Sequence, residues 1–294
     1  MSDKVPESVL RDRIVDVDVN LVRFARPGHV LRIAMFDDAV FEAVLTDLHV
    51  EPKIANSFHW TGTLRGYPNS SFVLTVHEQA FAGWIFPGSG PHRSLSIVGE
   101  YGHYHARETD DRKHKCGGGL APEAPPPVRD EVPLIAGCDD PLDSIDVLLL
   151  YDNSARSRGE STTRASILNA LAQGNEILRR SALSMRWVAA DLRHISYTGS
   201  GSTGTDLGRL QKTTDSYLNA AHSYRKTAKA DVVALVCGNV SGNTTGTGYC
   251  IGGANDYAWA FSVSSLDALS SMTLAHELGH NHGCAHNPEH IDCH

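Results

Sequence analysis

The sequence has no apolar run close to the roughly 20 residues that a membrane-spanning helix requires. Its opening, Met-Ser-Asp-Lys-Val-Pro-Glu, lacks the order of basic and then apolar residues that is typical of a secretory signal. Positive charge is also scarce, since 26 Lys and Arg stand against 34 Asp and Glu, a formal net charge of -8. Such a balance argues against a nucleic-acid partner. The sequence therefore predicts a mildly acidic protein with no membrane span and no bound nucleic acid.

The 294 residues are enough for about two domains, and the sequence pattern changes along the chain. Up to residue 107, apolar and polar residues alternate as in β-strands, for example from Val15 to Leu21, and turn residues such as those at 66–69 separate the runs. Residues 108–143 are charged at first and then rich in Gly and Pro, a composition that buries little apolar surface. We therefore predict an all-β domain over 1–107 and a linker over 108–143.

From residue 144 onward, short apolar runs alternate with amphipathic stretches of helical period. The predicted strands are 145–151, 185–197, 231–237, 249–252 and 257–263, and the predicted helices are 163–183, 205–228 and 266–282. A β-α-β-α-β order favours parallel strands covered by helices. Residues 144–294 are therefore predicted to form an α/β (α+β) domain with a twisted, mostly parallel sheet.

Histidine is unusually frequent, with 16 in the chain and six of them between His276 and His294. His276 and His280 are four residues apart, so on a helix they lie on one face, one turn from each other. Gly283 can adopt the left-handed conformation that ends a helix, which lets the chain fold back and bring His286 to the same place. This spacing predicts three imidazole ligands for one metal ion.

Three ligands leave a fourth position open, which is typical of a catalytic zinc site that activates a water molecule. Glu277 is placed to take the proton of that water and to pass it to a leaving amine. Two alternatives to a catalytic site exist. A solvated His-rich helix or tag does not account for Glu277 or Gly283, and a closed structural zinc site would need Cys284 or His290 as its fourth ligand.

Through the stretch 276–286, His-Glu-Leu-Gly-His-Asn-His-Gly-Cys-Ala-His, the sequence resembles the metzincin clan of zinc endopeptidases. Further stretches are similar to the adamalysin (reprolysin, ADAM-like) branch and its bacterial peptidyl-Asp metallopeptidase relatives, namely 146–151, Asn175, 230–236 and 260–263. The resemblance implies a metzincin catalytic domain that hydrolyses peptide or protein substrates. It also implies that His276, His280 and His286 bind Zn²⁺ and that Glu277 is the general base. In that branch an edge strand pairs with the substrate, and the stretch around 246–252 is the candidate.

The first domain resembles the propeptides of such proteases through 60–62, 69–71 and 81–85. In those zymogens a cysteine just before the mature domain occupies the open zinc position as a thiolate. Cys116 is the candidate latch, because its basic neighbours at 113–115 favour the thiolate form. The alternatives are an ordinary exposed thiol or one half of a disulfide. The resemblance thus implies a latched zymogen that is secreted.

Six cysteines are present, and five remain if Cys116 binds zinc, an odd number that cannot pair completely. The close pairs predicted among them are Cys237 with Cys250 and Cys284 with Cys293, which leaves Cys138 over. Disulfides fit the extracellular location that the resemblance implies.

The sequence departs from the metzincin pattern after His286, since only eight residues follow and none of the four methionines is among them. Metzincins form the floor of the zinc site with a methionine-containing turn in that part of the chain. We therefore expect a chain truncated before the Met-turn, either a fragment of a longer secreted zymogen or a shortened paralogue. The favoured function is a zinc-dependent metalloendopeptidase, and the alternative is a catalytically silent zinc-binding or interaction protein. The pattern gives no indication of an oligomeric state.

Overall fold

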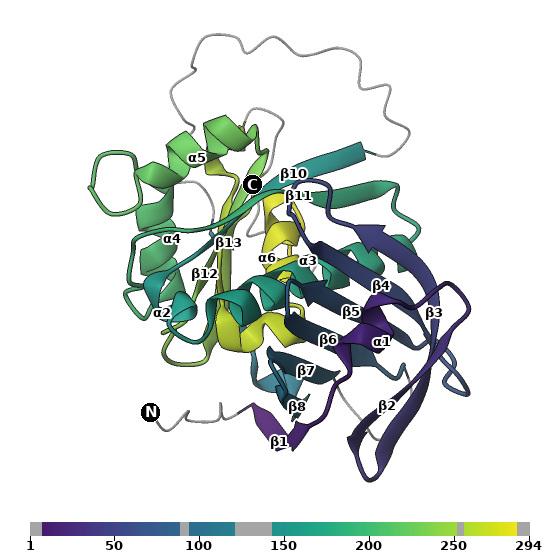
Figure 1. Ribbon diagram of the computed structural model, residues 1–294. Helices are drawn as coiled ribbons and strands as arrows, with labels where there is room; N and C mark the ends of the chain where they lie inside the picture. The colour runs from purple at the N-terminus through teal and green to yellow at the C-terminus, as the bar shows by residue number, and fades with distance from the viewer. Residues whose placement is uncertain (1–7, 89–93, 121–142, 252–255, 287–294) are drawn as a thin grey trace.

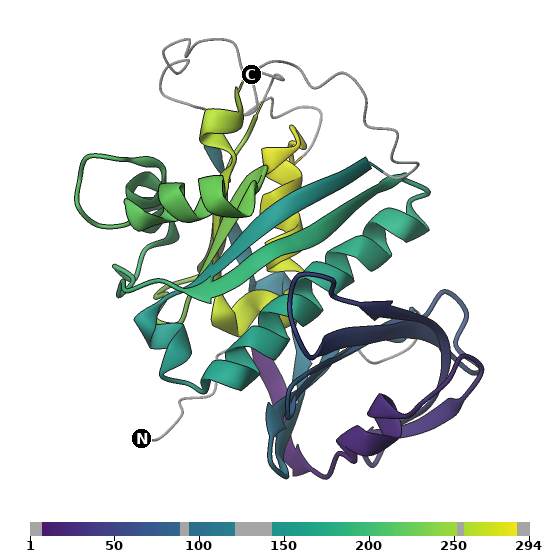
Figure 2. The same cartoon turned by 45° about the horizontal axis from the view of Figure 1, so that its top comes forward.

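The computed structural model describes residues 8–88, 94–120, 143–251 and 256–286. It contains two β-sheets, an eight-stranded sheet in the N-terminal half and a six-stranded sheet in the C-terminal half. The long helix α3 (Glu160–Arg180) lies between them, as the two views in Figures 1 and 2 show. Each sheet has its own hydrophobic core.

The N-terminal sheet is antiparallel throughout its strand order β1-β8-β7-β6-β5-β4-β3-β2. Its strands are β1 (Val9–Val15), β2 (Val30–Phe36), β3 (Ala39–Val50), β4 (Ser57–Leu64), β5 (Ser71–His77), β6 (Ala80–Phe86), β7 (Ser94–Glu100) and β8 (His103–Thr109). Its core contains large side chains with almost no exposed surface, among them Met35, Phe41, Trp60 and Phe72. The β-rich N-terminal domain predicted from the alternating pattern is therefore present.

One segment predicted as strand in this half is a helix. The alternation from Val15 to Leu21 indicated a strand, but the chain forms the short helix α1 (Val19–Arg23). Asp18 caps this helix, because its side chain accepts a hydrogen bond from the backbone N–H of Asn20 at 3.0 Å. The ring nitrogen of Trp60 donates to the carbonyl of Val22 at 3.0 Å and holds the helix on the core of the sheet.

The C-terminal sheet is mixed, with the strand order β11-β10-β12-β14-β13-β9. The strands are β9 (Lys115–Leu120), β10 (Asp143–Tyr151), β11 (Met185–His194), β12 (Val232–Cys237), β13 (Thr244–Tyr249) and β14 (Phe261–Ser265). The pair of β13 and β14 is antiparallel, whereas the other neighbours in the described part of the chain are parallel. This sheet forms the base on which the histidine-bearing helix rests.

Helices cover both faces of this sheet because its central strands are apolar on both sides. In β10, Val147 and Leu149 face α3 and the helix α6 (Thr273–Asn281), while Leu148 and Leu150 face the opposite core. The remaining helices are α2 (Asn153–Arg156), α4 (Thr203–Gln211) and α5 (Ala220–Ala228), with short 3₁₀ turns at 111–113, 256–259 and 266–271. A continuous apolar run is the expected pattern of a strand buried on both faces.

Several predicted elements of this half differ from the structure. Of the strand predicted over 249–252 only Tyr249 belongs to β13 within the described residues, and the strand predicted over 257–263 begins in the 3₁₀ turn at 256–259 and becomes β14 only at Phe261. The single helix expected over 205–228 is two helices, α4 and α5, and the chain between them includes Ser216 with a positive φ of 66°. The helix expected over 266–282 begins as a 3₁₀ turn, and α6 starts only after Met272, whose φ is 62°. The region 238–248, expected as a loop, contains most of β13. Its Gly and Thr residues form a strand because neighbouring strands pair with them, a tertiary effect that local propensity does not capture.

The segment predicted as a linker is partly regular structure. It begins inside β8 and continues through the 3₁₀ turn to β9, which pairs in parallel with β13. An exposed sheet edge offers unpaired N–H and C=O groups, and β9 satisfies those of β13. Residues 121–142 lie outside the described residues. The division at 107 and 143 stays a prediction.

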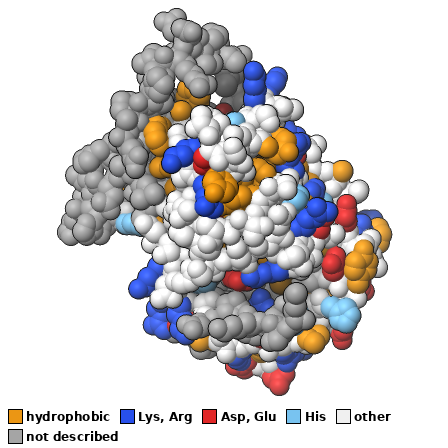
Figure 3. All heavy atoms as spheres, turned by 90° about the vertical axis from the view of Figure 1, so that its left-hand side faces the viewer, with side chains coloured by type: hydrophobic (Ala, Val, Ile, Leu, Met, Phe, Trp, Pro, Cys, Tyr) orange, Lys and Arg blue, Asp and Glu red, His pale blue; other side chains and the backbone are white. Residues whose placement is uncertain are grey.

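On the face drawn in Figure 3, Lys and Arg side chains and Asp and Glu side chains lie in small groups with uncharged surface between them. Within the described ranges, every helix is too short or too polar to cross a membrane.

The packing of β10 between two helical layers gives a stability prediction. Leu149 has no exposed surface, so Leu149→Ala is expected to lower the free energy of unfolding by about 2–5 kcal/mol through the cavity that it leaves. Leu183→Ala is the matched control, because Leu183 is 52% exposed and its truncation should cost less than about 0.5 kcal/mol. Urea unfolding of both variants measures the difference, and equal losses would contradict the assignment of β10 to the core.

Candidate metal centre

Helix α6 carries an apolar face toward the core and a histidine face toward β13. Leu274 and Leu278 have no exposed surface and belong to the core beneath the sheet. His276 and His280, one turn apart on the other side, have ring centroids separated by 4.8 Å. The side-chain amide of Asn281 donates to the carbonyls of Tyr249 at 2.8 Å and Phe261 at 3.0 Å. These two hydrogen bonds fix the end of α6 to the end of β13 and the start of β14.

The chain turns back after α6 as the glycine spacing predicted. Gly283 has a φ of 82°, in the left-handed region that favours glycine. The ring of His286 returns to the histidine face, and its Nε2 lies 3.1 Å from Nε2 of His276. The centroid of this ring is 4.8 Å from that of His280. The three predicted ligands are thus brought together.

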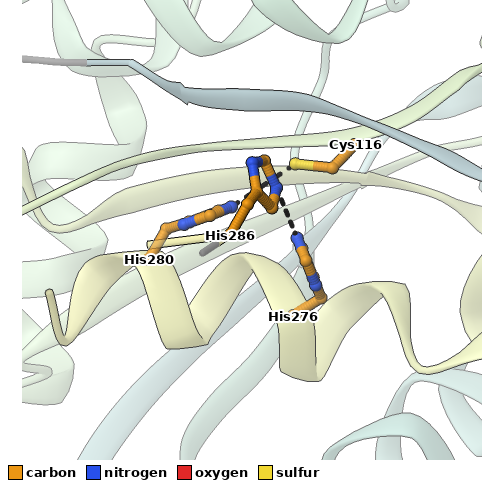
Figure 4. Close-up of side chains that lie close together, drawn as sticks. All are labelled: Cys116, His276, His280 and His286. Atoms are coloured by element: carbon orange, nitrogen blue, oxygen red, sulfur yellow. Dashed lines mark hydrogen bonds between the residues drawn. The ribbon is translucent and has the colours of Figure 1, made fainter. Parts of the chain in front are cut away.

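A fourth side chain, Cys116 of β9, completes the cluster shown in Figure 4. The sulfur of Cys116 lies 3.4 Å from Nε2 of His280. One potential ligand atom from each of Cys116, His276, His280 and His286 lies within 4.8 Å of all the others. Three imidazole nitrogens and one thiol are the donor set of tetrahedral zinc sites, so these residues fit such an ion.

The tautomer of His280 is fixed by the backbone. Its Nδ1 lies 2.7 Å from the carbonyl oxygen of Cys284, and a carbonyl oxygen can only accept, so Nδ1 carries the proton. The lone pair of Nε2 therefore points into the cluster. A backbone partner of this kind orients a metal-binding imidazole and increases its basicity.

The imidazoles of α6 are held in the neutral form that binds metals. Burial, followed by the charges of His280 and His286, lowers the pKa of His276 to about 4. Burial likewise lowers the pKa of His280 below its ordinary value, against the opposing effect of its bond to the Cys284 carbonyl. No proton then has to be displaced at neutral pH before a cation binds.

Glu277 is buried next to the cluster, although it is a carboxylate. It has no exposed surface, and its Oε1 has no hydrogen-bond partner among the described residues. Its Oε2 accepts a hydrogen bond from the Cys116 thiol at 3.6 Å. Burial raises the pKa of Glu277 to about 8, and the bond from Cys116 opposes this only in part. Buried carboxyl groups with a raised pKa next to candidate metal ligands are typical of proton-transfer sites.

Two glycines of β13 allow α6 to approach the strand. A Cβ atom at Gly246 would lie 2.4 Å from Oε1 of Glu277, and one at Gly248 would lie 2.8 Å from the backbone carbonyl of Glu277. The stretch was predicted as a substrate-pairing edge strand, but its role in seating Glu277 was missed. The sequence did contain a signal, since the alternation Thr-Gly-Thr-Gly at 245–248 leaves one face of a strand without side chains.

The cysteine predictions have different outcomes. Cys116 lies in the histidine cluster, whereas the Cys284 side chain is not part of that cluster, and the latch itself stays a prediction. The predicted disulfide between Cys237 and Cys250 is wrong, because Cys237 is a buried thiol while Cys250 is disulfide-bonded. The hydrophobic core around Cys237 encloses the thiol. The remaining residues named in these predictions lie outside the described residues, namely Cys138, His290 and Cys293.

A cluster of three histidines beside a buried glutamate defines a mononuclear metal centre of the kind found in metallopeptidases. The model of metallopeptidase family M12, in the form Reprolysin_5, matches residues 142–294. This is more than half of the chain, which therefore belongs to this family. The resemblance to metzincin-type metallopeptidases found in the sequence is confirmed.

The relatives with similar sequences that are described below have the same name, peptidyl-Asp metalloendopeptidase. The chain is 29% identical over 145 residues to a peptidyl-Asp metalloendopeptidase of Stenotrophomonas maltophilia (strain R551-3), covering 49% of this chain and 34% of the relative. It is 29% identical over 147 residues to one of Xanthomonas campestris pv. campestris, with the same two coverages. The chain thus spans about a third of the length of the curated relatives it matches.

A solved structure has a similar fold along most of the chain. Metalloproteinase-II from Bacteroides fragilis superimposes with a TM-score of 0.57 at 12% identity, covering 93% of this chain and 86% of that one. The likeness shows a shared fold that includes both halves of the chain.

The glycine contacts give a second prediction. Gly246→Ala is expected to lower the free energy of unfolding by about 1–3 kcal/mol, because its methyl group forces α6 away from β13. Gly208→Ala in α4 is the control, since a Cβ there meets no atom within 4 Å and alanine favours the helix. Thermal unfolding of both variants measures the effect. An unchanged melting temperature for Gly246→Ala would refute the close seating of Glu277.

Proposed function

We propose that this chain contains the catalytic domain of a zinc-dependent metalloendopeptidase and that the N-terminal half holds it in a latched form. The observation that supports this most directly is the convergence of His276, His280 and His286 beside the buried Glu277. Membership of the metallopeptidase family and the names of the relatives point the same way. Peptides or proteins are the proposed substrates.

The donor set favours zinc over the hard cations, because imidazole and thiol are soft or borderline ligands. When bound, zinc supplies Lewis acidity that polarises a scissile carbonyl and makes a water molecule more acidic. His276, His280 and His286 would hold the ion. The bond from His280 to the Cys284 carbonyl keeps that ring oriented.

Glu277 is the proposed general base. Its carboxylate lies beside the histidines and faces the backbone of Gly246, with one oxygen left without a partner among the described residues. It would accept the proton of the attacking water and deliver it to the amine that leaves the cleaved bond. Burial raises the pKa of Glu277, so the carboxyl holds a proton more readily than an exposed glutamate, which suits a group that keeps the proton between the two steps.

Strand β13 is the proposed substrate-binding strand. One edge of β13 pairs with β14, and the other edge pairs with β9. In the second pair Lys115 lies opposite Thr244 and Cys116 lies opposite Gly246. An extended peptide substrate would pair with the same backbone groups. β9 therefore competes with the substrate for β13, so the pairing of β9 with β13 would by itself inhibit peptide hydrolysis.

Cys116 is the proposed latch. Its sulfur lies among the potential metal ligands, next to His280 and Glu277. A thiolate there would fill the fourth position that substrate and water need. We accordingly interpret residues 1–107 as a propeptide-like domain, 108–143 as the connecting segment and 144–294 as the protease domain.

Secretion is part of the proposal. The disulfide at Cys250 supports it, because disulfides persist in oxidising compartments.

The general-base role predicts a defined loss. Glu277→Ala should lower kcat/KM for peptide hydrolysis by at least about 100-fold while the metal content stays at one ion per chain, because the histidines remain. A fluorogenic peptide assay with the protease domain freed of the N-terminal half measures activity, and metal analysis measures occupancy. Undiminished cleavage by Glu277→Ala would refute the mechanism. Bound zinc without turnover in the unmodified domain would instead indicate the silent zinc-binding alternative.

The latch predicts a spectroscopic change. In protein reconstituted with Co²⁺, the thiolate of Cys116 should give a sulfur-to-cobalt charge-transfer band, and Cys116→Ser should remove it while the cobalt stays bound. Cys237→Ser is the control, because that thiol is buried away from the cluster. A band that persists in Cys116→Ser would rule out the latch.

A further inference from the structure

The two halves of the chain are joined by an interface that is separate from their cores. The apolar core of the N-terminal sheet and the two cores of the C-terminal half have no residue in common, although Ile54 of the N-terminal half packs in one of the C-terminal cores. Between them lie two small apolar clusters, one with Trp84 against Ala172 and one with Ala82 against Ala165. Small apolar clusters combined with many hydrogen bonds are typical of interfaces between separable partners.

The centre of this interface is Asn169 on α3. Its side-chain Nδ2 lies within hydrogen-bond distance of three acceptors on the N-terminal sheet, namely the carbonyl of Val73 at 3.1 Å, Oγ1 of Thr75 at 3.0 Å and the carbonyl of Ala82 at 3.1 Å. Asn169 is 3% exposed. In the docked state these N–H groups are buried and satisfied by acceptors of the N-terminal sheet, and water takes the place of those acceptors once the sheet has left.

Two arginines of α3 extend the interface on either side of Asn169. Arg180 donates to Oγ of Ser71 at 3.0 Å and to the carbonyl of Asn69 at 2.8 Å. Arg164 donates from Nε to Nε2 of His77 at 2.9 Å. We name the contact of Arg164, Asn169, Ala172 and Arg180 with β5 and β6 the α3 interface, and Figure 2 shows α3 lying against that sheet.

His77 can make its contacts only as a neutral imidazole. A guanidinium has only donors, so Nε2 of His77 must accept the bond from Arg164. The proton is then on Nδ1, which lies 2.7 Å from Oγ of Ser57, and that hydroxyl donates in turn to the carbonyl of Ala55 at 3.1 Å. A second proton on Nε2 would oppose the N–H of Arg164. His77 is 1% exposed, so water does not relieve the conflict.

We propose that the α3 interface keeps the N-terminal half bound after the chain is cut within residues 121–142, and that protonation of His77 opens this interface. The strand β9 precedes those residues, so after the cut it stays covalently joined to β8. The retained half then keeps Cys116 at the metal centre, and in this respect the inference rests on the proposed function. A cut alone therefore does not clear the site.

The direction of the pH dependence follows from the surroundings of His77. The groups that face it are Arg164 from α3 and Ser57 from β4, and Glu78 adjoins it in the chain. Burial lowers its pKa, the charge of Arg164 lowers it further, and Glu78 acts in the opposite sense. The docked state thus binds fewer protons than the separated state. Docking is strongest above the ordinary histidine pKa of about 6.5 and weakens as the pH falls below it.

A second histidine contributes in the same direction. Burial lowers the pKa of His49, and the charges of His59 and of Arg186 on β11 lower it further, while Asp47 and Glu51 act against them. Replacing His77 is therefore expected to reduce the pH dependence of docking rather than to abolish it.

The test uses the full chain with a recognition sequence for a site-specific protease placed within residues 121–142. Cys116→Ser is included, so that a metal-bound thiolate does not hold the halves together. After the cut, size-exclusion chromatography over a range of concentrations gives the Kd of the two halves. Co-elution at about pH 7.5 is expected, with a Kd that rises at least about tenfold by about pH 5. Separation at the higher pH would overturn the proposal.

Substitutions test whether the residues of the α3 interface hold the two halves together. Asn169→Asp replaces the donors with a carboxylate that faces the carbonyls of Val73 and Ala82, so the cut halves should separate at neutral pH. Asn219→Asp makes the same change at an exposed site and should leave the Kd unaltered. Thr75→Val, on the opposite side of the interface, should also weaken binding and serves if Asn169→Asp fails to fold. An unaltered Kd in Thr75→Val and Asn169→Asp would refute the α3 interface.

His77→Gln tests the acid response. A glutamine can accept from Arg164 and donate to Ser57 without titrating, so the rise in Kd on acidification should become smaller. An equal rise in this variant would refute the role of His77. Elution requires no catalysis, so the two proposals can be tested apart. Halves that stay together at neutral pH would support the α3 interface, and a protease half without peptidase activity after separation from the N-terminal half would refute the proposed function and leave the α3 interface standing.

Discussion

The close contact between α6 and β13 is the constraint on which the metal centre depends. Two of the imidazoles lie on α6 and the third follows the turn at its end, whereas Cys116 reaches them from a strand that pairs with β13. The distance between helix and strand therefore decides whether these side chains meet. That distance is small because Gly246 and Gly248 present no side chains to Glu277 and its backbone. Asn281 then secures the end of the helix to the same strand through the carbonyl of Tyr249.

The N-terminal half contacts the C-terminal half in two physically different ways. At one place β9 adds a strand to the sheet, a backbone interaction that requires little of the side chains apart from Cys116. At the other, the side chains of α3 donate to carbonyls and hydroxyls of β5 and β6. In the proposed function the first contact covers the substrate-binding strand, and in the proposed retention the second keeps the covering half in place. The two proposals thus assign inhibition and retention to different residues.

Much of the site could be predicted from sequence because its spacing is local. His276, Glu277 and His280 share one helix, and Gly283 ends it three residues before His286, so their relation depends on helix geometry alone. Most buried strands of the C-terminal half were also predicted, since a run such as 145–151 has few alternatives. The alternation from Val15 to Leu21 was misleading at its end. A cap at Asp18 and the hydrogen bond from Trp60 favour the helix α1 in that place. β13 was missed in part because its Gly and Thr residues form a strand only between two partners.

The sequence by itself determined the chemistry that is proposed for this protein: which side chains are the candidate metal ligands, which carboxylate is the candidate base beside them, and which cysteine is the candidate latch. These follow from residue type and short-range spacing. Only the tertiary structure decided that β9 lies on β13, that Cys116 reaches the histidines, and that Asn169, Arg164 and His77 join the two halves. Those contacts connect residues about 90 to 160 positions apart, as between His77 and Arg164 or Cys116 and Glu277. Their partners are selected by burial and hydrogen-bond complementarity, which no local pattern encodes.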